Sequence, residues 1–326
     1  MTSKLIFVDD SLPGISRRKI RNKWAYFDAQ GERIADREEI DRLNRIGLPP
    51  AYVDTWFAPS ERAHILATGL DAKGRKQYRY HPDFRAVRDA EKFDGCAQFG
   101  RLLPLIRARI EDDLALRNFS QERAIASIVR LLDSGRIRIG NEAYAKSNKS
   151  FGATTLRMKH AKIKGSKLLL RFKAKSGKQW EIGITATRLI SFVKQMEDMP
   201  GQHLFQYLRE DGDPAPVTSS DVNAYIRETM GADFTAKHFR TWRATALAFE
   251  WLAEEKSTGL NDMLAFVAEH LCNTPAIARK SYVHPTLIDI AKNRPLAFRE
   301  SLHLPRKTRW LSRYERGLIE CLEGRD

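Results

Sequence analysis

The apolar periodicity of the chain changes once, near residue 89, and this change divides the chain into two parts. Before it, short alternating segments are separated by turn residues, which is typical of β-strands and hairpins. These segments are residues 23–27, 63–69 and 76–80. After it, apolar residues recur at helical spacing, as in 125–132 and 260–267. We therefore predict a β-rich domain over residues 1–88 and a mainly helical domain over 89–326.

A β-hairpin interrupts the helical part. Leu168, Leu170 and Phe172 alternate with more polar neighbours, a turn follows at 175–178, and the return segment alternates at Trp180, Ile182 and Ile184. The expected fold class is thus α+β: a small β-rich N-terminal domain plus a larger mainly α-helical domain with an inserted β-hairpin.

The chain is basic, and its charge is concentrated. It has 326 residues with a formal net charge of +15, and the stretch from Arg136 to Lys178 holds thirteen Lys and Arg residues but one acid, Glu142. Aromatic residues are interleaved with these cations, as at Tyr144 and Phe151. Cations mixed with aromatic side chains are typical of nucleic-acid binding, because each neutralised phosphate releases counterions. We expect a nucleic acid as the partner, and the family resemblance described below implies double-stranded DNA.

Other classes of protein are not indicated. No apolar run approaches the roughly 18 residues that span a bilayer, so no membrane partner is expected. Asp9 and Asp10 interrupt any signal-peptide core, which favours a cytoplasmic protein, associated with the nucleoid through DNA.

The motifs of several kinds of chemistry are missing. There is no GxxxxGK[ST] motif, so we expect no nucleotide cofactor, and no HExxH or CxxC motif, so we expect no metal and no other cofactor. The acids at 111–113 are interpreted as a solvated helix face. A two-metal nuclease would need several converging acids.

A metal-free phosphoryl transfer needs a nucleophile, cations around the phosphorus, and an acid for the leaving oxygen. The segment 271–282 offers the nucleophile. Thr274 and Pro275 predict a helix start, with Thr as the cap and Pro in the first position. Tyr282 then lies about two turns along this helix, nine residues after Asn273.

These residues resemble the active-site segment of the poxvirus-like bacterial type IB DNA topoisomerases. Further motifs resemble that family in order and spacing, and together they cover about residues 20 to 290. They are Arg138-Ile139-Gly140 with Tyr144 four residues on, the lysine hairpin 172–178 with Lys175, the second arginine motif 237–241 with Arg240, and the DNA-clamping strand 71–82.

The resemblance implies an ATP-independent isomerase that relaxes supercoiled DNA through a 3′-phosphotyrosyl intermediate, acting as a monomer without a required metal. It implies that Tyr282 is the nucleophile, that Arg138 and Arg240 bind the non-bridging oxygens, and that Lys175 protonates the leaving oxygen. Asn273 would bind phosphate where many members carry histidine. The residues it implies for DNA binding are Gln77, Tyr78, Tyr80, Tyr144 and Lys146.

Two alternatives stay open at this point. A tyrosine recombinase shares the nucleophile and the two arginines, but the β-rich N-terminal part argues against it. So does Lys237, which stands where a His-x-x-Arg box ending at Arg240 would need histidine. A non-catalytic basic DNA-binding protein would explain the charge but not the spacing of the motifs.

Overall fold

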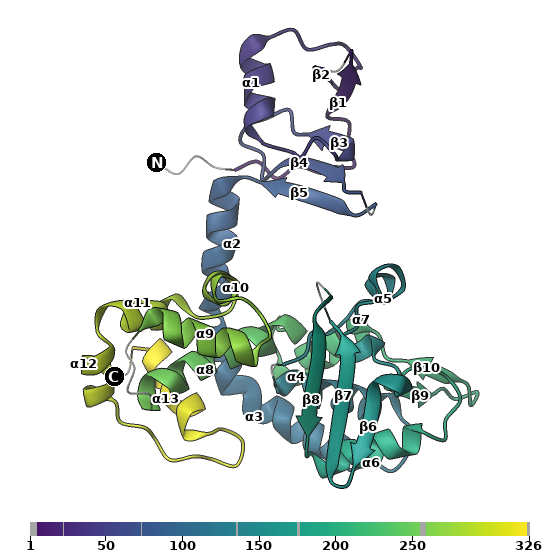
Figure 1. The fold of residues 1–326 in the computed structure, drawn as a ribbon, viewed down its shortest axis with the longest axis vertical. Helices are drawn as coiled ribbons and strands as arrows, with labels where there is room; N and C mark the ends of the chain where they lie inside the picture. The colour runs from purple at the N-terminus through teal and green to yellow at the C-terminus, as the bar shows by residue number, and fades with distance from the viewer. Residues whose placement is uncertain are drawn as a thin grey trace. The chain divides into compact units, whose positions relative to one another are not determined.

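The computed structural model describes residues 5–21, 23–72, 74–134, 136–174, 177–254 and 259–324. The chain forms two compact units, Met1–Lys92 and Phe93–Asp326 (Figure 1). The division predicted after residue 88 falls inside helix α2 (Pro82–Asp94). The predicted α+β fold is confirmed, with a β-sheet in the first unit and a mainly helical second unit. No helix in the described part of the chain is long and apolar enough to cross a membrane.

The first unit is an antiparallel sheet with the strand order β2-β1-β3-β4-β5 and one helix, α1. The predicted strands at 23–27 and 76–80 are confirmed as β2 and β5, and the one at 63–69 as β4, shifted to start at Ile65. The remaining elements, β1, β3 and α1, were not predicted. The bounds are β1 (Ile15–Ile20), β2 (Lys23–Phe27), α1 (Arg37–Arg45), β3 (Val53–Phe57), β4 (Ile65–Leu70) and β5 (Lys76–Tyr80).

The two faces of this sheet differ. One packs against α1, and its core contains Ile15, Tyr26, Leu43, Phe57 and Ala67. The other carries the cross-strand row Ser16, Trp56, Thr68 and Tyr78, because directly paired residues of antiparallel strands share a face.

A segment that we call the N-terminal strap (residues 6–14) is attached to this unit at both ends. The amide of Ile6 donates to the carbonyl of Arg62, and the amide of His64 donates to the carbonyl of Ile6. At the other end, Nε1 of Trp56 donates to the carbonyl of Leu12 at 2.9 Å. Gly14 lies against the same indole, and a Cβ there would be 2.2 Å from Nε1, so only glycine fits.

In the second unit, helices cover one face of a three-stranded antiparallel sheet with the order β6-β7-β8 (Figure 1). The predicted hairpin is confirmed as β7 and β8, and β6 adds a third strand. The bounds are α3 (Cys96–Asp113), α4 (Gln121–Asp133), α5 (Glu142–Asn148), β6 (Ala161–Lys164), β7 (Lys167–Lys173), β8 (Gln179–Ile184), α6 (Thr187–Met196), β9 (Gln206–Leu208), β10 (Pro214–Pro216), α7 (Ser219–Met230), α8 (Ala236–Glu254), α9 (Leu260–His270), α10 (Pro275–Ser281), α11 (Pro285–Asn293), α12 (Pro295–Ser301) and α13 (Arg313–Leu322), with short 3₁₀ turns at Ala153–Thr155 and Met158–His160.

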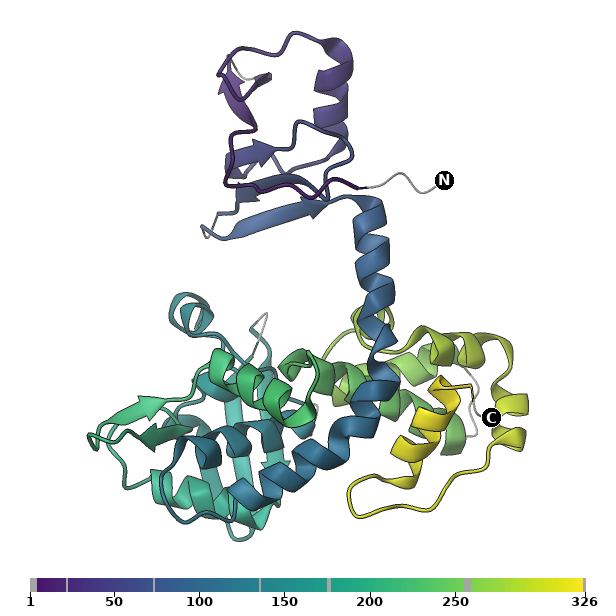
Figure 2. The same ribbon diagram turned by 180° about the vertical axis from the view of Figure 1, so that it is seen from behind.

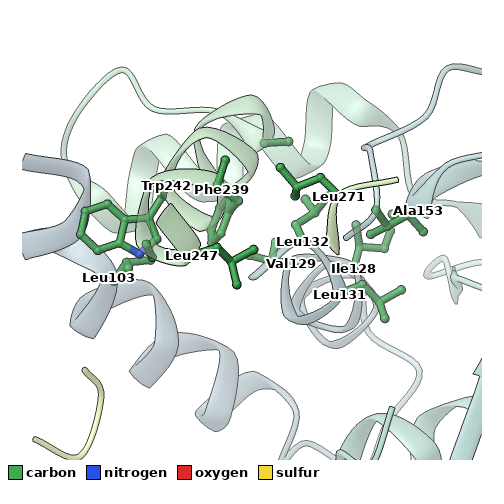
Figure 3. Close-up of a cluster of buried hydrophobic side chains, with 14 of the residues drawn as sticks. Leu103, Ile128, Val129, Leu131, Leu132, Ala153, Phe239, Trp242, Leu247 and Leu271 are labelled. Atoms are coloured by element: carbon green, nitrogen blue, oxygen red, sulfur yellow. The ribbon is translucent and has the colours of Figure 1, made fainter. Parts of the chain in front are cut away.

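The core of this unit is built mainly on α3, α4 and α8. Figure 2 shows α3, in blue, running across the unit. Leu103 of α3, Ile128 and Leu132 of α4, and Phe239 and Leu247 of α8 are all buried (Figure 3). This core supports the loop after α4 and the first turns of α8, where the arginine motifs lie.

The C-terminal segment is fixed to this core by a network of charged side chains. Arg107 of α3 pairs with Asp133 at the end of α4 at 2.9 Å and with Glu315 of α13 at 2.7 Å. Arg107 also donates to the carbonyl of Trp310, and Nε1 of Trp242 donates to Glu315. Burial opposes ionisation of Glu315, but the hydrogen bonds and charge of Arg107 hold the pKa of this carboxyl below its ordinary value.

The interpretation of residues 111–113 as a solvated helix face is wrong for Asp113, whereas Asp112 is exposed. Asp113 is buried, and it accepts hydrogen bonds from the hydroxyl of Tyr225 at 2.7 Å and from Nε of Arg109 at 2.8 Å. Glu111 pairs with Arg309 at 3.1 Å. These acids bind α3 to α7 and to the C-terminal segment, which a count of charges along the sequence does not reveal.

Candidate active site

Arg138 lies in the loop that follows α4, and its backbone is fixed by the 3₁₀ turn at Ala153–Thr155. The amide of Ala153 donates to the carbonyl of Arg138 at 2.8 Å. Gly140 has a φ of +97°, and a Cβ on it would lie 3.0 Å from Oγ1 of Thr155. The glycine of the Arg-Ile-Gly motif is therefore needed for both its conformation and its close packing.

Arg240 lies in the second turn of α8 and is only 4% exposed. Its guanidinium donates to the carbonyls of Arg136 at 3.2 Å and Leu271 at 2.6 Å. The rings of Trp180 and Tyr282 lie 5.8 and 5.2 Å from its Cζ, within cation–π range. Burial lowers the pKa of Arg240, and the charge of Arg138 lowers it further. The site thus holds two neighbouring cations, one of them desolvated.

Asn273 follows α9 and faces Arg138. Its Oδ1 accepts a hydrogen bond from Arg138 at 3.0 Å. Its Nδ2 is buried, and within the described ranges it has no hydrogen-bond partner. The backbone turns into this position through Cys272, which has a φ of +46°, and the amide of Asn273 donates to the carbonyl of Ala268. A buried donor of this kind is costly unless a ligand accepts its hydrogen bond.

Tyr282 lies at the end of α10. The predicted helix start is confirmed, since Oγ1 of Thr274 accepts from the amide of Ile277 and Pro275 is the first helical residue. The helix ends at Ser281, however, so Tyr282 is its C-cap, with a φ of −137°. The phenol is therefore presented from a helix end rather than from within a helix.

A buried hydroxyl of α8 holds the backbone around Tyr282. Oγ1 of Thr245 lies 3.1 Å from the carbonyl oxygen of Tyr282 and 2.9 Å from that of Thr241, to which it can donate. The amide of His284 donates to the same Oγ1 at 3.3 Å. These contacts attach the residues on both sides of Val283 to the helix that carries Arg240.

The phenol of Tyr282 is electrostatically activated. Burial alone would raise its pKa, but the charges of Arg240 and Arg138, together with hydrogen bonds from both guanidiniums, lower the pKa below its ordinary value. A lower pKa favours the phenolate, which is the attacking form of a tyrosine nucleophile.

The structure thus brings together four of the five predicted catalytic side chains: Arg138, Arg240, Asn273 and Tyr282. The fifth, Lys175, lies outside the described residues. Among the residues that are described, no group of three or more His, Cys, Asp or Glu side chains is placed to hold a metal ion.

The predicted DNA-binding residues lie on two elements. Tyr78 and Tyr80 of β5 are 40% and 37% exposed, and their rings stack at 5.7 Å with an interplanar angle of 10°. Gln77 precedes Tyr78 on β5, and its Nε2 donates to Asp71, just after β4, at 3.0 Å. Lys146 is exposed on α5, and Tyr144 belongs to the same helix, with its side chain outside the described part.

Comparisons with known proteins agree with this geometry. The family profile "Eukaryotic DNA topoisomerase I, catalytic core" matches residues 81–292, and "Bacterial DNA topoisomerase IB, N-terminal domain" matches residues 23–71. DNA topoisomerase 1B of Acanthamoeba polyphaga mimivirus is 32% identical over 304 residues, which cover 89% of this chain and 90% of that protein. The chain belongs to the type IB DNA topoisomerase family. The predicted family and enzyme class are confirmed.

More distant relatives of this topoisomerase carry related names. DNA topoisomerase 1B of Vaccinia virus (strain Copenhagen) is 22% identical over 246 residues, covering 74% of this chain and 77% of that protein. Among solved structures, the XerH site-specific recombinase in its post-cleavage complex covers 62% of this chain and 51% of that chain at a TM-score of 0.39 and 15% identity. That likeness is too weak to support an argument.

Two residues of this topoisomerase were missed in the sequence. Thr245 carries no motif signal, because threonine inside a helix is ordinary, and its importance comes from the backbone of Tyr282, 37 positions away. Asp10 was considered only for its effect on a signal peptide. In the structure it forms an ion pair with Lys76 on β5.

Proposed function

We propose that this topoisomerase relaxes supercoiled duplex DNA by cleaving one strand transiently and resealing it. The observation that carries the proposal is the phenol of Tyr282, which lies beside the guanidiniums of Arg138 and Arg240 with a lowered pKa. A nucleophile surrounded by fixed cations suits attack on a phosphodiester, whose transition state gathers negative charge on the non-bridging oxygens.

The chemistry is an exchange of esters. The oxygen of Tyr282 attacks the phosphorus, a 3′-phosphotyrosyl bond forms, and the bond to the 5′-oxygen breaks. Lys175 supplies the proton that the 5′-oxygen needs, assisted by Arg138. Religation is the reverse attack by the 5′-hydroxyl on the same phosphorus. Since one phosphodiester replaces another, ATP is not required. The guanidiniums of Arg138 and Arg240 supply the positive charge that a metal ion would otherwise provide.

The side chain of Asn273 completes the phosphate site. Its buried Nδ2 donates to a non-bridging oxygen, while its Oδ1 keeps Arg138 in place. An amide adds a hydrogen bond but no charge, so this position contributes less than a histidinium would.

Duplex DNA is the substrate, and the first unit, with the exposed tyrosine pair of β5, acts as a clamp on it. Tyr78 and Tyr80 supply the stacked aromatic surface, and Gln77, Tyr144 and Lys146 add polar contacts. The enzyme acts as a monomer in the cytoplasm, associated with the nucleoid through DNA.

The decisive experiment is relaxation of supercoiled plasmid by dilute protein in EDTA without ATP, beside the variant Tyr282→Phe. We expect stepwise relaxation by the parent and none by Tyr282→Phe, which still binds DNA because only the nucleophilic oxygen is removed. Relaxation by Tyr282→Phe would show that another residue is the nucleophile. Recombinant or linear products from the parent would instead support a recombinase or a nuclease.

A further inference from the structure

Lys76 stands beside the proposed DNA-contacting tyrosines of β5. Its Nζ lies 5.8 Å from the ring centroid of Tyr78, whose ring stacks on that of Tyr80. Alternation along β5 places Lys76, Tyr78 and Tyr80 on one exposed face. A cation next to stacked aromatic rings is a natural ligand for a backbone phosphate of DNA.

In the free protein a carboxylate occupies that position. Oδ2 of Asp10 lies 2.7 Å from Nζ of Lys76. The hydrogen bond that Lys76 donates to Asp10 is the main cause that raises the pKa of Lys76 above its ordinary value. A carboxylate resembles a phosphate in its negative charge and its acceptor oxygens.

The N-terminal strap, not the ion pair alone, places Asp10. Upstream, the backbone of Ile6 is hydrogen-bonded to the backbone of residues 62 and 64, and the amide of Val8 donates to Nδ1 of His64 at 3.1 Å. Phe7 packs its ring against His64 at 4.7 Å. Downstream, Leu12 is bonded to Trp56. Asp10 therefore remains close to Lys76 even when the ion pair is broken.

We propose that Lys76 is a further phosphate-binding residue of this enzyme and that Asp10 of the N-terminal strap occupies its site until DNA exchanges the carboxylate for a backbone phosphate. The inference deepens the proposed function and rests on its claim that β5 faces DNA. The side chain of Lys76 is 43% exposed and that of Asp10 is 17% exposed, so a phosphate can reach the lysine from solvent. Because ion pairs at the surface are weak, removing such a competitor should strengthen binding by at most about fivefold.

The neighbouring Asp9 provides a matched control. Asp9 is exposed, and its Oδ1 accepts from the amide and hydroxyl of Ser11. Asp9→Asn and Asp10→Asn each remove one negative charge from adjacent positions. Among the described contacts only Asp10 forms an ion pair with Lys76, whereas Asp9 adds a smaller Coulombic attraction without direct contact. A difference between the two variants therefore reports the ion pair rather than the net charge.

The experiment measures binding of a duplex oligonucleotide against salt concentration, in full-length protein carrying Tyr282→Phe so that no covalent complex forms. Relative to Asp9→Asn, we expect Asp10→Asn to bind about two- to fivefold more tightly at low salt. The plot of log Kobs against log salt should be steeper by up to about 0.9, since without Asp10 no displaced carboxylate takes up a salt cation when the phosphate binds to Lys76. Relative to Asp10→Asn, Lys76→Gln should weaken DNA binding and make the plot of log Kobs against log salt shallower by up to about 0.9.

A double variant makes the inference falsifiable. In a Lys76→Gln background, Asp10→Asn should change DNA affinity no more than Asp9→Asn does, because the ion pair no longer exists. Equal DNA affinities of Asp9→Asn and Asp10→Asn in protein that retains Lys76 would overturn the inference. So would an increase in affinity from Asp10→Asn that persists in the Lys76→Gln background. Tyr78→Ala separates this from failure of the proposed function: if Tyr78→Ala leaves affinity unchanged, β5 is not the DNA face.

Discussion

At the scale of single residues, the amide of Asn273 has two separate tasks. Its oxygen accepts from Arg138, and its nitrogen is a buried donor for which the described residues supply no acceptor. Most active-site donors are already bonded to protein or solvent groups, so this arrangement is an indication of a missing ligand. The proposed phosphate oxygen would fill that position.

We therefore expect Asn273→Ala to slow single-turnover DNA cleavage by about 100-fold, the usual cost of removing one donor to a developing oxyanion. Asn273→His should keep or raise the rate, since imidazole retains a donor and can add charge. The control is Asn293→Ala, an exposed amide of α11 that donates to Asp289 within its own helix. A fully active Asn273→Ala enzyme would remove Asn273 from the site.

Among the residues of the site, those with a motif were predictable and those without one were not. Arg138, Arg240 and Tyr282 belong to short patterns with fixed spacing, and the structure brings them together. Asp10 and Thr245 act through partners that are 66 and 37 positions away, so nothing in their local sequence marks them. Such contacts depend on tertiary structure and require coordinates.

At the scale of elements, helix α13 is connected to the core by two arginines of α3 that differ in burial. Arg107 is mostly buried between Asp133 and Glu315, whereas Arg101 is exposed and pairs with Glu323 at 2.6 Å. Both join the same two helices. Comparing the two arginines therefore tests whether the stability of the second unit depends on how buried the arginine is, since both connect α3 to the end of the chain.

Arg107→Ala should destabilise the second unit by about 3 to 5 kcal/mol, because it leaves the buried carboxylate of Glu315 without its cation and Asp133 with only the longer pair to Arg130, at 3.6 Å. The melting temperature should fall by about 10 °C, as measured by calorimetry. Arg101→Ala, the control, should cost less, because the Arg101 side chain is 55% exposed and pairs with one carboxylate rather than two. Equal shifts for the two variants would show that burial of the network around Arg107 does not matter.

The elements that were not predicted share a physical reason. Strand β1 has the sequence ISRRKI, whose alternation is hidden because Arg17 takes a core-side position. The two terminal nitrogens of the Arg17 guanidinium donate there to the carbonyls of Leu48 and Pro49, both at 2.9 Å. Helix α1 is dominated by charged residues, and of its nine side chains only Leu43 is fully buried. Strands β2 and β5 were predictable because their aromatic alternation is plain.

At the scale of the whole molecule, the chain of 37.4 kDa contains the proposed nucleophile together with both arginines. No second copy is needed to complete that set. A recombinase would need several protomers on paired DNA sites, whereas relaxation needs one nicked strand and one enzyme.

The monomer proposal predicts that the initial rate of plasmid relaxation rises in direct proportion to protein concentration. Sedimentation of the Tyr282→Phe protein with a short duplex should give a mass of one chain and one duplex. A rate that rises with the square of the concentration, or a complex with two chains, would contradict the proposal and revive the recombinase alternative.

Arg240 and Thr245 are five residues apart on the rigid helix α8. The guanidinium of Arg240 lies over the ring of Tyr282, and the hydroxyl of Thr245 contacts the backbone carbonyl of Tyr282. The proposed nucleophile Tyr282 and the guanidinium of Arg240 are consequently both attached to α8. If α8 tilts or slides, both move with it, and the distance between them is preserved. Under the proposed function, strain from bound DNA can therefore be absorbed elsewhere in the chain without changing the distance between Tyr282 and Arg240.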